Sequence, residues 1–157
     1  MTKISTLCRV LRGITNHPLN RSKKLNAVER FARWQLGYRL NPYPIIYPFT
    51  NRSKLVVEKG MAGATGNLYS GLSEYEGMSF LLHFLRANDL FVDAGANVGS
   101  FTVLAAAHVG AHTISIEPSP LTYVKLMNNV RINNVQDKVN AHQVALGEKV
   151  SIQGHYL

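Results

Sequence analysis

The chain has 157 residues, 46% hydrophobic and 17% charged, a composition typical of one folded domain that excludes a disordered chain. It contains one cysteine, Cys8, which excludes a disulfide framework and a cysteine-rich metal site. No apolar run approaches the roughly 20 residues that cross a bilayer, and basic residues interrupt the apolar ones near the N-terminus, unlike a signal peptide. We therefore expect a cytoplasmic globular protein without a transmembrane segment.

The net charge of +8 is concentrated in the first part of the chain. Residues 1–60 contain 12 lysines and arginines against two acidic residues, whereas residues 61–157 contain five against seven. Such a basic region either docks on nucleic acid, a membrane surface or an acidic partner, or simply faces water. No nucleic-acid-binding motif accompanies the charge. We therefore expect a solvated basic extension over 1–60, no nucleic-acid partner, and a separate unit over 61–157.

The N-terminal extension is predicted to be mainly helical. Two short amphipathic helices are expected within residues 1–40, separated by a polar break at 16–24. The prolines within 41–48 fix an extended backbone there, because they lock φ and restrict the residues before them. Residues 54–59 then have the pattern of a short strand.

The segment from Gly60 to Gly66 is rich in glycine and is predicted to be a turn. It lacks the Gly-Lys-Ser/Thr ending of a phosphate-binding loop, which excludes that function. A helix is predicted to begin at Ser73, because Ser73 and Glu76 have the spacing of a capping box. The helix is expected to end at 88–89.

The rest of the chain alternates between strand and helix patterns. Strands are predicted at 90–95, 112–117 and 139–146, with a helix after each of the first two. The second of these helices is expected to be capped by Ser119 and opened by Pro120. This order predicts an α/β fold with a parallel sheet and right-handed crossovers. Residues 149–157 have the pattern of one further strand.

The turn after the first of these strands has the features of a cofactor-binding loop. Gly95 and Gly99 allow a sharp turn and close approach of a ligand, and ligands bind beyond the carboxyl ends of the strands in such sheets. A dinucleotide loop needs glycine where Asn97 stands. Asp93 would repel a pyrophosphate but would suit the cationic sulfonium and amino groups of S-adenosylmethionine (SAM). Glu117, at the end of the second strand, is placed to accept hydrogen bonds from ribose hydroxyls.

These residues resemble the FkbM-family methyltransferases. The resemblance covers roughly residues 50–157 and rests on LFVDAGANVGSFTVL at 90–104, IEPSP at 116–120, the asparagine pair at 128–129 and ALG at 145–147. It implies a class I methyltransferase Rossmann-like fold and methyl transfer from SAM to a hydroxyl of a sugar, glycolipid or secondary metabolite. Residues 61–157 would then be a partial SAM-binding domain.

The resemblance also implies roles for individual residues. Six residues of the turn would line the methionine and ribose of SAM: Asp93, Ala94, Gly95, Ala96, Asn97 and Gly99. Glu117 would bind the ribose hydroxyls, with Pro118 shaping the turn beside it. Ala145 and Leu146 would contact adenine, and Tyr69 and Glu76 match positions of further ligand contacts.

The family pattern is incomplete in this sequence. The acidic motif that the family carries on its fourth strand has no match, so we expect only the first three core strands of the sheet. The strand at 90–95 would then be an exposed apolar edge, and we expect the chain either to be marginally stable alone or to self-associate through this edge. The alternative to an active O-methyltransferase is a catalytically inactive truncated fragment that at most binds SAM weakly. No catalytic residue is assigned, and the six histidines lack metal-ligand spacing, so no metal site is expected.

Overall fold

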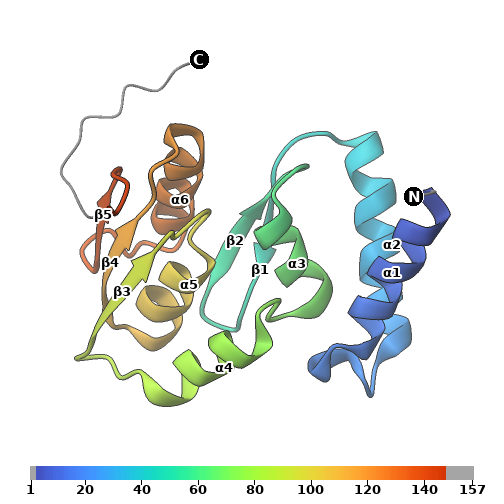
Figure 1. Cartoon of the computed structure of the whole chain (residues 1–157), viewed down its shortest axis with the longest axis horizontal. Helices are drawn as coiled ribbons and strands as arrows, with labels where there is room; N and C mark the ends of the chain where they lie inside the picture. Colours follow the sequence, from blue (N-terminus) through green and yellow to red (C-terminus); the bar gives the residue numbers. More distant parts are fainter. Residues whose placement is uncertain (1–2, 148–157) are drawn as a thin grey trace.

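A computed structural model describes residues 3–147, and its centre is a three-stranded parallel sheet. The strands are β3 (Leu90–Ala94), β4 (His112–Ile116) and β5 (Val139–His142), in the order β3-β4-β5 (Figure 1). As predicted, a helix follows each of the first two strands: α-helical and π-helical residues connect β3 to β4, and a longer helix connects β4 to β5. The predicted α/β architecture with three parallel core strands is therefore confirmed.

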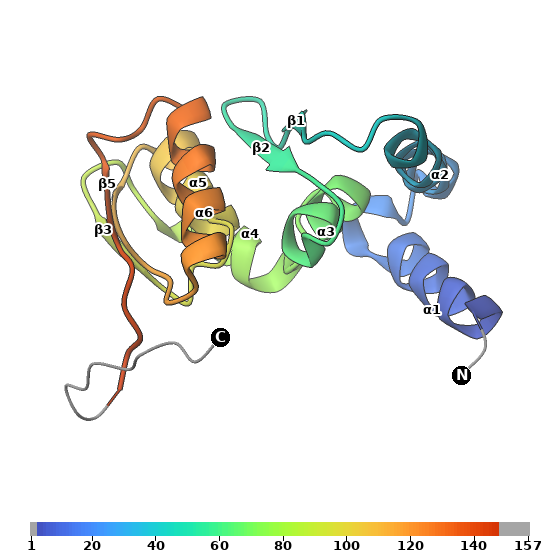
Figure 2. The same cartoon turned by 90° about the horizontal axis from the view of Figure 1, so that it is seen from above.

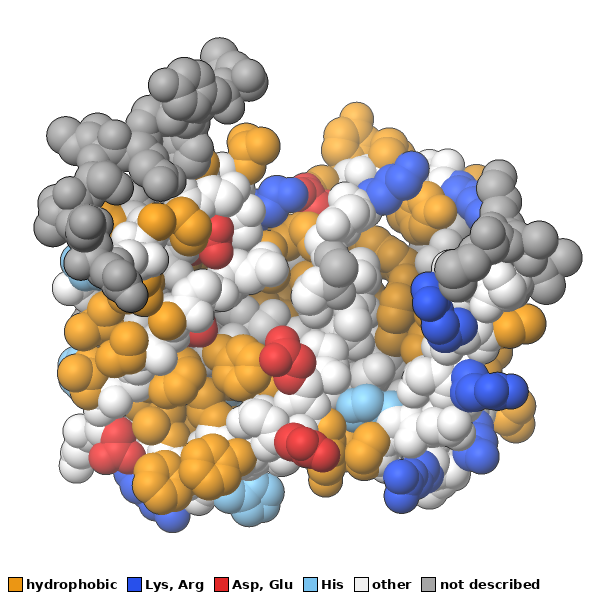
Figure 3. Space-filling model, viewed as in Figure 1, with side chains coloured by type: hydrophobic (Ala, Val, Ile, Leu, Met, Phe, Trp, Pro, Cys, Tyr) orange, Lys and Arg blue, Asp and Glu red, His pale blue; other side chains and the backbone are white. Residues whose placement is uncertain are grey.

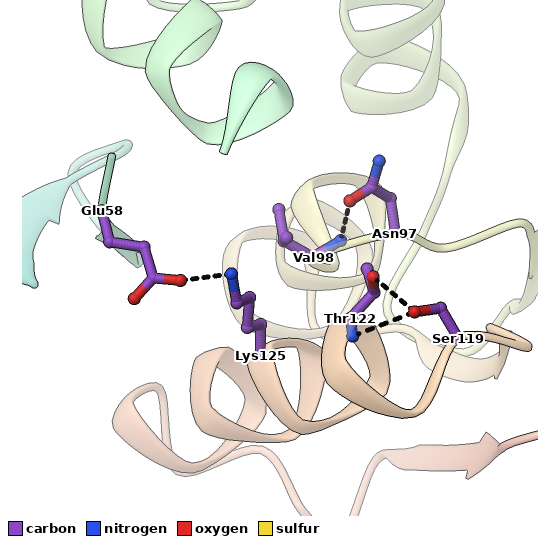
Figure 4. Close-up of polar contacts among 6 residues, drawn as sticks. All are labelled: Glu58, Asn97, Val98, Ser119, Thr122 and Lys125. Carbon is purple, nitrogen blue, oxygen red and sulfur yellow. Dashed lines mark hydrogen bonds and ion pairs between the residues drawn. The ribbon is translucent and has the colours of Figure 1, made fainter. Parts of the chain in front are cut away.

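The two connecting helices lie on the same side of this sheet (Figure 2). The first is α5 (Ser100–Val103), continued by the π-helical turn Leu104–Val109, and the second is α6 (Pro120–Ile132). Ser119 caps α6 by accepting a hydrogen bond from the backbone of Thr122, as the sequence predicts (Figure 4). The helices bury a cluster of small and branched side chains against the sheet: Ala96, Ala106, Leu126, Val130 and Val135.

The outer edge and one face of β3 remain uncovered within the described residues. β3 is hydrogen-bonded only to β4 there. Leu90 and Val92 are 61% and 53% exposed, whereas Phe91 and Asp93, which alternate with them, point toward the helices. The stacked rings of Phe80 and Phe84 are also exposed, and Figure 3 shows hydrophobic side chains gathered over β3 and α4 at the lower left. The expectation that β3 is an apolar edge is confirmed for the described part of the chain.

The N-terminal region contains the two predicted helices, and the predicted extended segment and strand pair with each other as a hairpin, which was not predicted. The helices are α1 (Lys3–Asn16) and α2 (Lys24–Leu40), joined by a 3-10 turn over Pro18–Asn20. The hairpin pairs β1 (Ile45–Pro48) with β2 (Lys54–Val57) in antiparallel register. None of the helices in the part of the chain described is long and apolar enough to cross a membrane.

The hairpin is attached to α6 through two asparagine side chains. Asn129 Oδ1 accepts a hydrogen bond from the Val56 amide at 2.7 Å, and its Nδ2 donates to the Val98 carbonyl at 2.7 Å. Asn133 bonds both the amide and the carbonyl of Lys54, each at 2.8 Å. These bonds occupy the edge of β2 that β1 leaves free. The main hydrophobic core is built from residues of both 1–60 and 61–157. It contains Trp34, Leu55, Val57, Met78, Val98 and Leu104.

Four local expectations about element type and element boundaries are wrong. The glycine-rich stretch is not a turn but the helix α3 (Ala62–Ser70), whose Ala64 and Leu68 are buried in the core. Ser73 does not cap a helix, because α4 (Tyr75–Phe84) begins two residues later with Glu74 at its N-cap position, and the Ser73 amide donates instead to Asn67 Oδ1 at 2.8 Å. The helix also ends at Phe84 and not at residues 88–89. β5 ends at His142 and not at residue 146. The further strand expected at 149–157 lies outside the described residues.

Candidate cofactor site

A cleft of about 490 Å3 opens at the carboxyl ends of the sheet. Its size lies within the range of small-molecule and cofactor sites, roughly 300–1,000 Å3. One wall is formed by the end of β3, the turn that follows it as far as Val98, and the start of α5. The opposite wall comes from α3 and the segment before α4, including Gly63, Ser73 and Glu74. Two acidic residues and no lysine or arginine line this cleft, so its electrostatic potential favours a cation.

Asp93 is the most constrained acidic group of the cleft. It is 8% exposed, and its Oδ2 accepts a hydrogen bond from Thr102 Oγ1 at 2.6 Å. Thr102 Oγ1 in turn lies 2.8 Å from Ser115 Oγ on β4. Burial raises the pKa of Asp93, and the nearby Glu74 and Glu117 raise it further, whereas the hydrogen bonds with Thr102 oppose these effects. A carboxylate held in this way would be stabilised by a bound cation.

The two glycines of the turn have different structural roles. Both have positive φ, 76° at Gly95 and 84° at Gly99. A Cβ at Gly95 would meet nothing within 4 Å, so this glycine leaves open space on the cleft wall. A Cβ at Gly99 would lie closer than 3.0 Å to Leu126 Cδ1, so this glycine lets α6 pack on the turn. Gly95 therefore fits a ligand-contacting role, and Gly99 fits a packing role beneath the site.

Asn97 also has positive φ, 51°, which asparagine tolerates better than most residues. Its Oδ1 accepts a hydrogen bond from the Val98 amide at 2.7 Å, which ties the side chain to the turn (Figure 4). Asn97 and Ala94 are exposed, Ala96 is buried, and all three line the cleft. The structure thus brings Asp93, Ala94, Gly95, Ala96 and Asn97 together on one wall.

Glu117 supports the turn from below and does not line the cleft. Its Oε2 accepts a hydrogen bond from the Asn97 amide at 2.9 Å, and its Oε1 accepts one from the Ser119 amide at 3.0 Å. Each carboxylate oxygen has a second lone pair, so Glu117 retains acceptor capacity beyond these two bonds. Glu117 is 7% exposed, and its two bonds to backbone amides fix the turn after β3 against the start of α6.

The remaining sequence-predicted residues do not line this cleft. Pro118 is exposed after the end of β4. Ala145 and Leu146 are exposed beyond the end of β5. Tyr69 bonds Gln35 on α2 through its hydroxyl at 3.2 Å, and Glu76 lies in the first turn of α4. The structure therefore brings none of these five residues to the cleft wall.

Sequence reasoning missed several polar residues that shape the site. Thr102 and Ser115 hold Asp93 in place, and Asn67 is fully buried and donates from Nδ2 to Ser100 Oγ at 3.0 Å. Thr102 interrupts the apolar run of residues 101–107, and Ser115 stands between two isoleucines of β4, which in each case is a signal of a buried hydrogen bond. Asn67 had no such signal, because α3 was not predicted. In the described part of the chain, no three histidine, cysteine or acidic side chains group together as a metal site would require.

Comparison with known proteins gives structural neighbours only. No family model matches the chain, and no curated protein matches it. The structure of TYW2 from Pyrococcus horikoshii in complex with MeSAdo is similar over 67% of this chain, with 20% identity and a TM-score of 0.54. A putative transferase from the same organism gives the same values. An RNA methyltransferase from Salinibacter ruber in complex with S-adenosylhomocysteine covers 48% of this chain and 49% of its own, with 28% identity and a TM-score of 0.43, too low to support an argument.

The first two matches show the fold. The chain has the class I methyltransferase Rossmann-like architecture, represented by its three described parallel strands. It spans 37% of the length of these two proteins. The resemblance to the FkbM family stays a prediction.

Proposed function

We propose that this chain is the cofactor-binding part of a SAM-dependent methyltransferase. The observation that carries the proposal is the cleft at the strand ends, where Asp93 and Glu74 are present and no basic residue is. A pyrophosphate-containing cofactor would bring negative charge to these carboxylates, whereas the sulfonium and amino groups of SAM are positive. The bound MeSAdo named for the TYW2 structure supports the same class of cofactor.

Within this proposal, Asp93, Ala94, Gly95, Ala96 and Asn97 hold the methionine and ribose portions of the cofactor. Gly99 and Glu117 act beneath them by fixing the turn, and Glu117 uses its free lone pairs for the ribose hydroxyls. Two further residues complete the proposed cofactor-binding residues: Pro118 shapes the turn beside Glu117, and Ala145 contacts adenine. SAM, when bound, supplies a methyl group activated by the positive sulfur. The residues of this chain bind and orient it, and none is assigned as the base for the acceptor.

The finer proposal is methylation of the FkbM type. It is supported by the motifs at 90–104 and 116–120, and it implies a hydroxyl of a sugar, glycolipid or secondary metabolite as acceptor. The basic region 1–60 and the methyltransferase region 61–157 are proposed as the two parts of the chain, and the cytoplasm as its location.

Calorimetric titration with SAM, S-adenosylhomocysteine and NADH tests the cofactor. We expect the first two to bind and NADH not to bind. Asp93→Ala should weaken SAM binding by about 10- to 100-fold, because a charge-assisted contact contributes roughly 1.5–3 kcal/mol. Asp137→Ala is the matched control, since Asp137 is exposed and lies outside the cleft. Binding of NADH alone, or SAM binding unchanged by Asp93→Ala, would refute the proposal.

A further inference from the structure

A second cavity of about 320 Å3 lies on the N-terminal side of the molecule and shares no lining residue with the strand-end cleft. It is formed by α2, the start of the hairpin and α3. Its walls include three aromatic side chains, those of Trp34, Tyr38 and Tyr47. Arg30 and Arg33 line the same cavity. Aromatic walls beside guanidinium groups suit a planar ring that carries negative charge.

The positive charge around this cavity is only partly neutralised. Arg33 forms an exposed ion pair with Glu29, with 2.8 Å between Nη2 and Oε1. Arg30 is bonded only to neutral oxygens, because its Nη2 donates to Asn20 Oδ1 and to the Tyr69 carbonyl, at 2.8 and 2.9 Å. Its Nε is buried without an acceptor among residues 3–147. Lys59 Nζ lies 5.3 Å from the centre of the Tyr38 ring, which adds a further cation.

This cationic site belongs to a larger basic surface. Figure 3 shows lysine and arginine side chains gathered over α1 and α2 at the right of the molecule. The other ion pair found in the described part of the chain joins Lys125 to Glu58, so Glu58 is already paired (Figure 4). A negatively charged ligand would therefore approach the cavity through a positive potential.

Gly37 lines the cavity and has no side chain to occupy it. It lies inside α2, where glycine is less favourable than alanine by about 0.5–1 kcal/mol. A Cβ at this position would meet nothing within 4 Å, so no packing contact explains the glycine. Gly37 lines the cavity, and a larger side chain here would project into the open space. A glycine that weakens its helix and faces an open cavity is consistent with a ligand passing close to the backbone.

We propose that this cavity binds a nucleoside monophosphate unit, with the base against Trp34, Tyr38 and Tyr47 and the phosphate on Arg33 and Arg30. Base stacking on aromatic side chains and phosphate contacts to arginine are the two general components of nucleotide binding. An acyl lipid surface fits less well, because membrane-surface helices present an exposed apolar face rather than an aromatic cavity. The unit comes either from a free nucleotide or from single-stranded RNA. The proposal replaces the sequence-based expectation of no nucleic-acid partner and does not depend on SAM binding.

The test is calorimetric titration of the full chain with uridine monophosphate, in which the Gly37→Leu variant assigns binding to this cavity whether or not the strand-end cleft binds S-adenosylhomocysteine. A second titration uses a short single-stranded oligouridine. We expect binding that weakens as salt is raised. Gly37→Leu, which places a side chain in the cavity, should weaken binding at least about 10-fold, and Arg33→Ala about 3- to 10-fold.

Gly13→Leu is the matched control, because Gly13 is another glycine inside a helix, α1, with open space around it and no part in the cavity. Circular dichroism and thermal melting check that each variant is folded. Binding of either probe that is lost in Gly37→Leu and retained in Gly13→Leu supports the proposal, and the probe that binds more tightly identifies the source. No binding of either probe, equal binding by both variants, or binding only to anionic phospholipid vesicles would overturn it.

Discussion

Replacing Gly99 by alanine tests whether the turn after β3, residues 95–99, is fixed by its packing on α6. Two costs are expected from the structure. Alanine at a φ of 84° costs about 1–2 kcal/mol relative to glycine. The new methyl group would also overlap Cδ1 of Leu126, so this fully buried side chain would have to shift within the core, at a further cost of about 1–3 kcal/mol. Gly99→Ala should therefore lower the free energy of unfolding by about 2–5 kcal/mol.

Gly95→Ala is the matched comparison, because it has a similar φ of 76° but open space around the new Cβ. Its stability cost should be the backbone term alone, about 1–2 kcal/mol. Its effect on SAM binding should be larger, since the methyl group would enter the cleft. Urea denaturation, followed by the fluorescence of the single tryptophan, Trp34, and by circular dichroism, gives both free energies.

A double-mutant cycle with Leu126→Ala separates the two contributions to Gly99→Ala. In the Leu126→Ala background the overlap is removed, so Gly99→Ala should cost only its backbone term. The coupling energy should be about 1–3 kcal/mol. A cost for Gly99→Ala equal to that for Gly95→Ala, together with a coupling near zero, would refute the packing argument.

Three further predictions concern charge, the sheet edge and the α6 attachment. Burial raises the pKa of Asp93 above its ordinary 3.8, so ionisation of this carboxyl destabilises the unliganded fold. The free energy of unfolding should therefore fall as pH rises from the ordinary pKa to the raised one. Urea titrations of Asp93→Asn should show a flatter pH dependence, and a slope identical to that of the wild type would contradict this. Val92→Lys on the β3 edge should reduce self-association measured by light scattering, whereas Val124→Lys, at similar exposure on α6, should leave it unchanged; a monomeric wild-type chain would disprove the edge contact. Asn129→Ala should lower the free energy of unfolding by about 2–4 kcal/mol, because the Val56 amide and the Val98 carbonyl lose their partner. Asn128→Ala, at an exposed position, should lower it by less than about 0.5 kcal/mol. Similar melting temperatures for the two variants would contradict this.

The strands and helices around the cofactor loop were predictable because their local signals agree with the tertiary structure. The apolar run of β3 ends at a carboxylate and a glycine, and Ser119 with Pro120 opens α6 where the sequence indicates. At these positions propensity, capping and burial favour the same conformation, so the pattern alone is sufficient.

Elsewhere the structure depends on contacts between distant residues. α3 contains two glycines and reads as a turn, yet burial of Ala64 and Leu68 against the hairpin stabilises it as a helix. The opposite wall of the cleft follows from this helix, because Asn67 binds the Ser73 amide across the α3–α4 connection. The role of Gly99 was also only half predicted. Its positive φ is readable from the motif, but its contact with Leu126, 27 residues later, is not.

The asparagine contacts between β2 and α6 have a consequence for how the chain folds during synthesis. Asn133 is separated by 79 residues from Lys54, whose backbone it completes, and Asn129 by 73 from Val56. At a translation rate of about 5–20 residues per second, the hairpin would wait roughly 4–16 s after its own synthesis before these partners are made. During this interval the edge of β2 has unpaired backbone groups, so the nascent hairpin is open to pairing with other chains until α6 has been made.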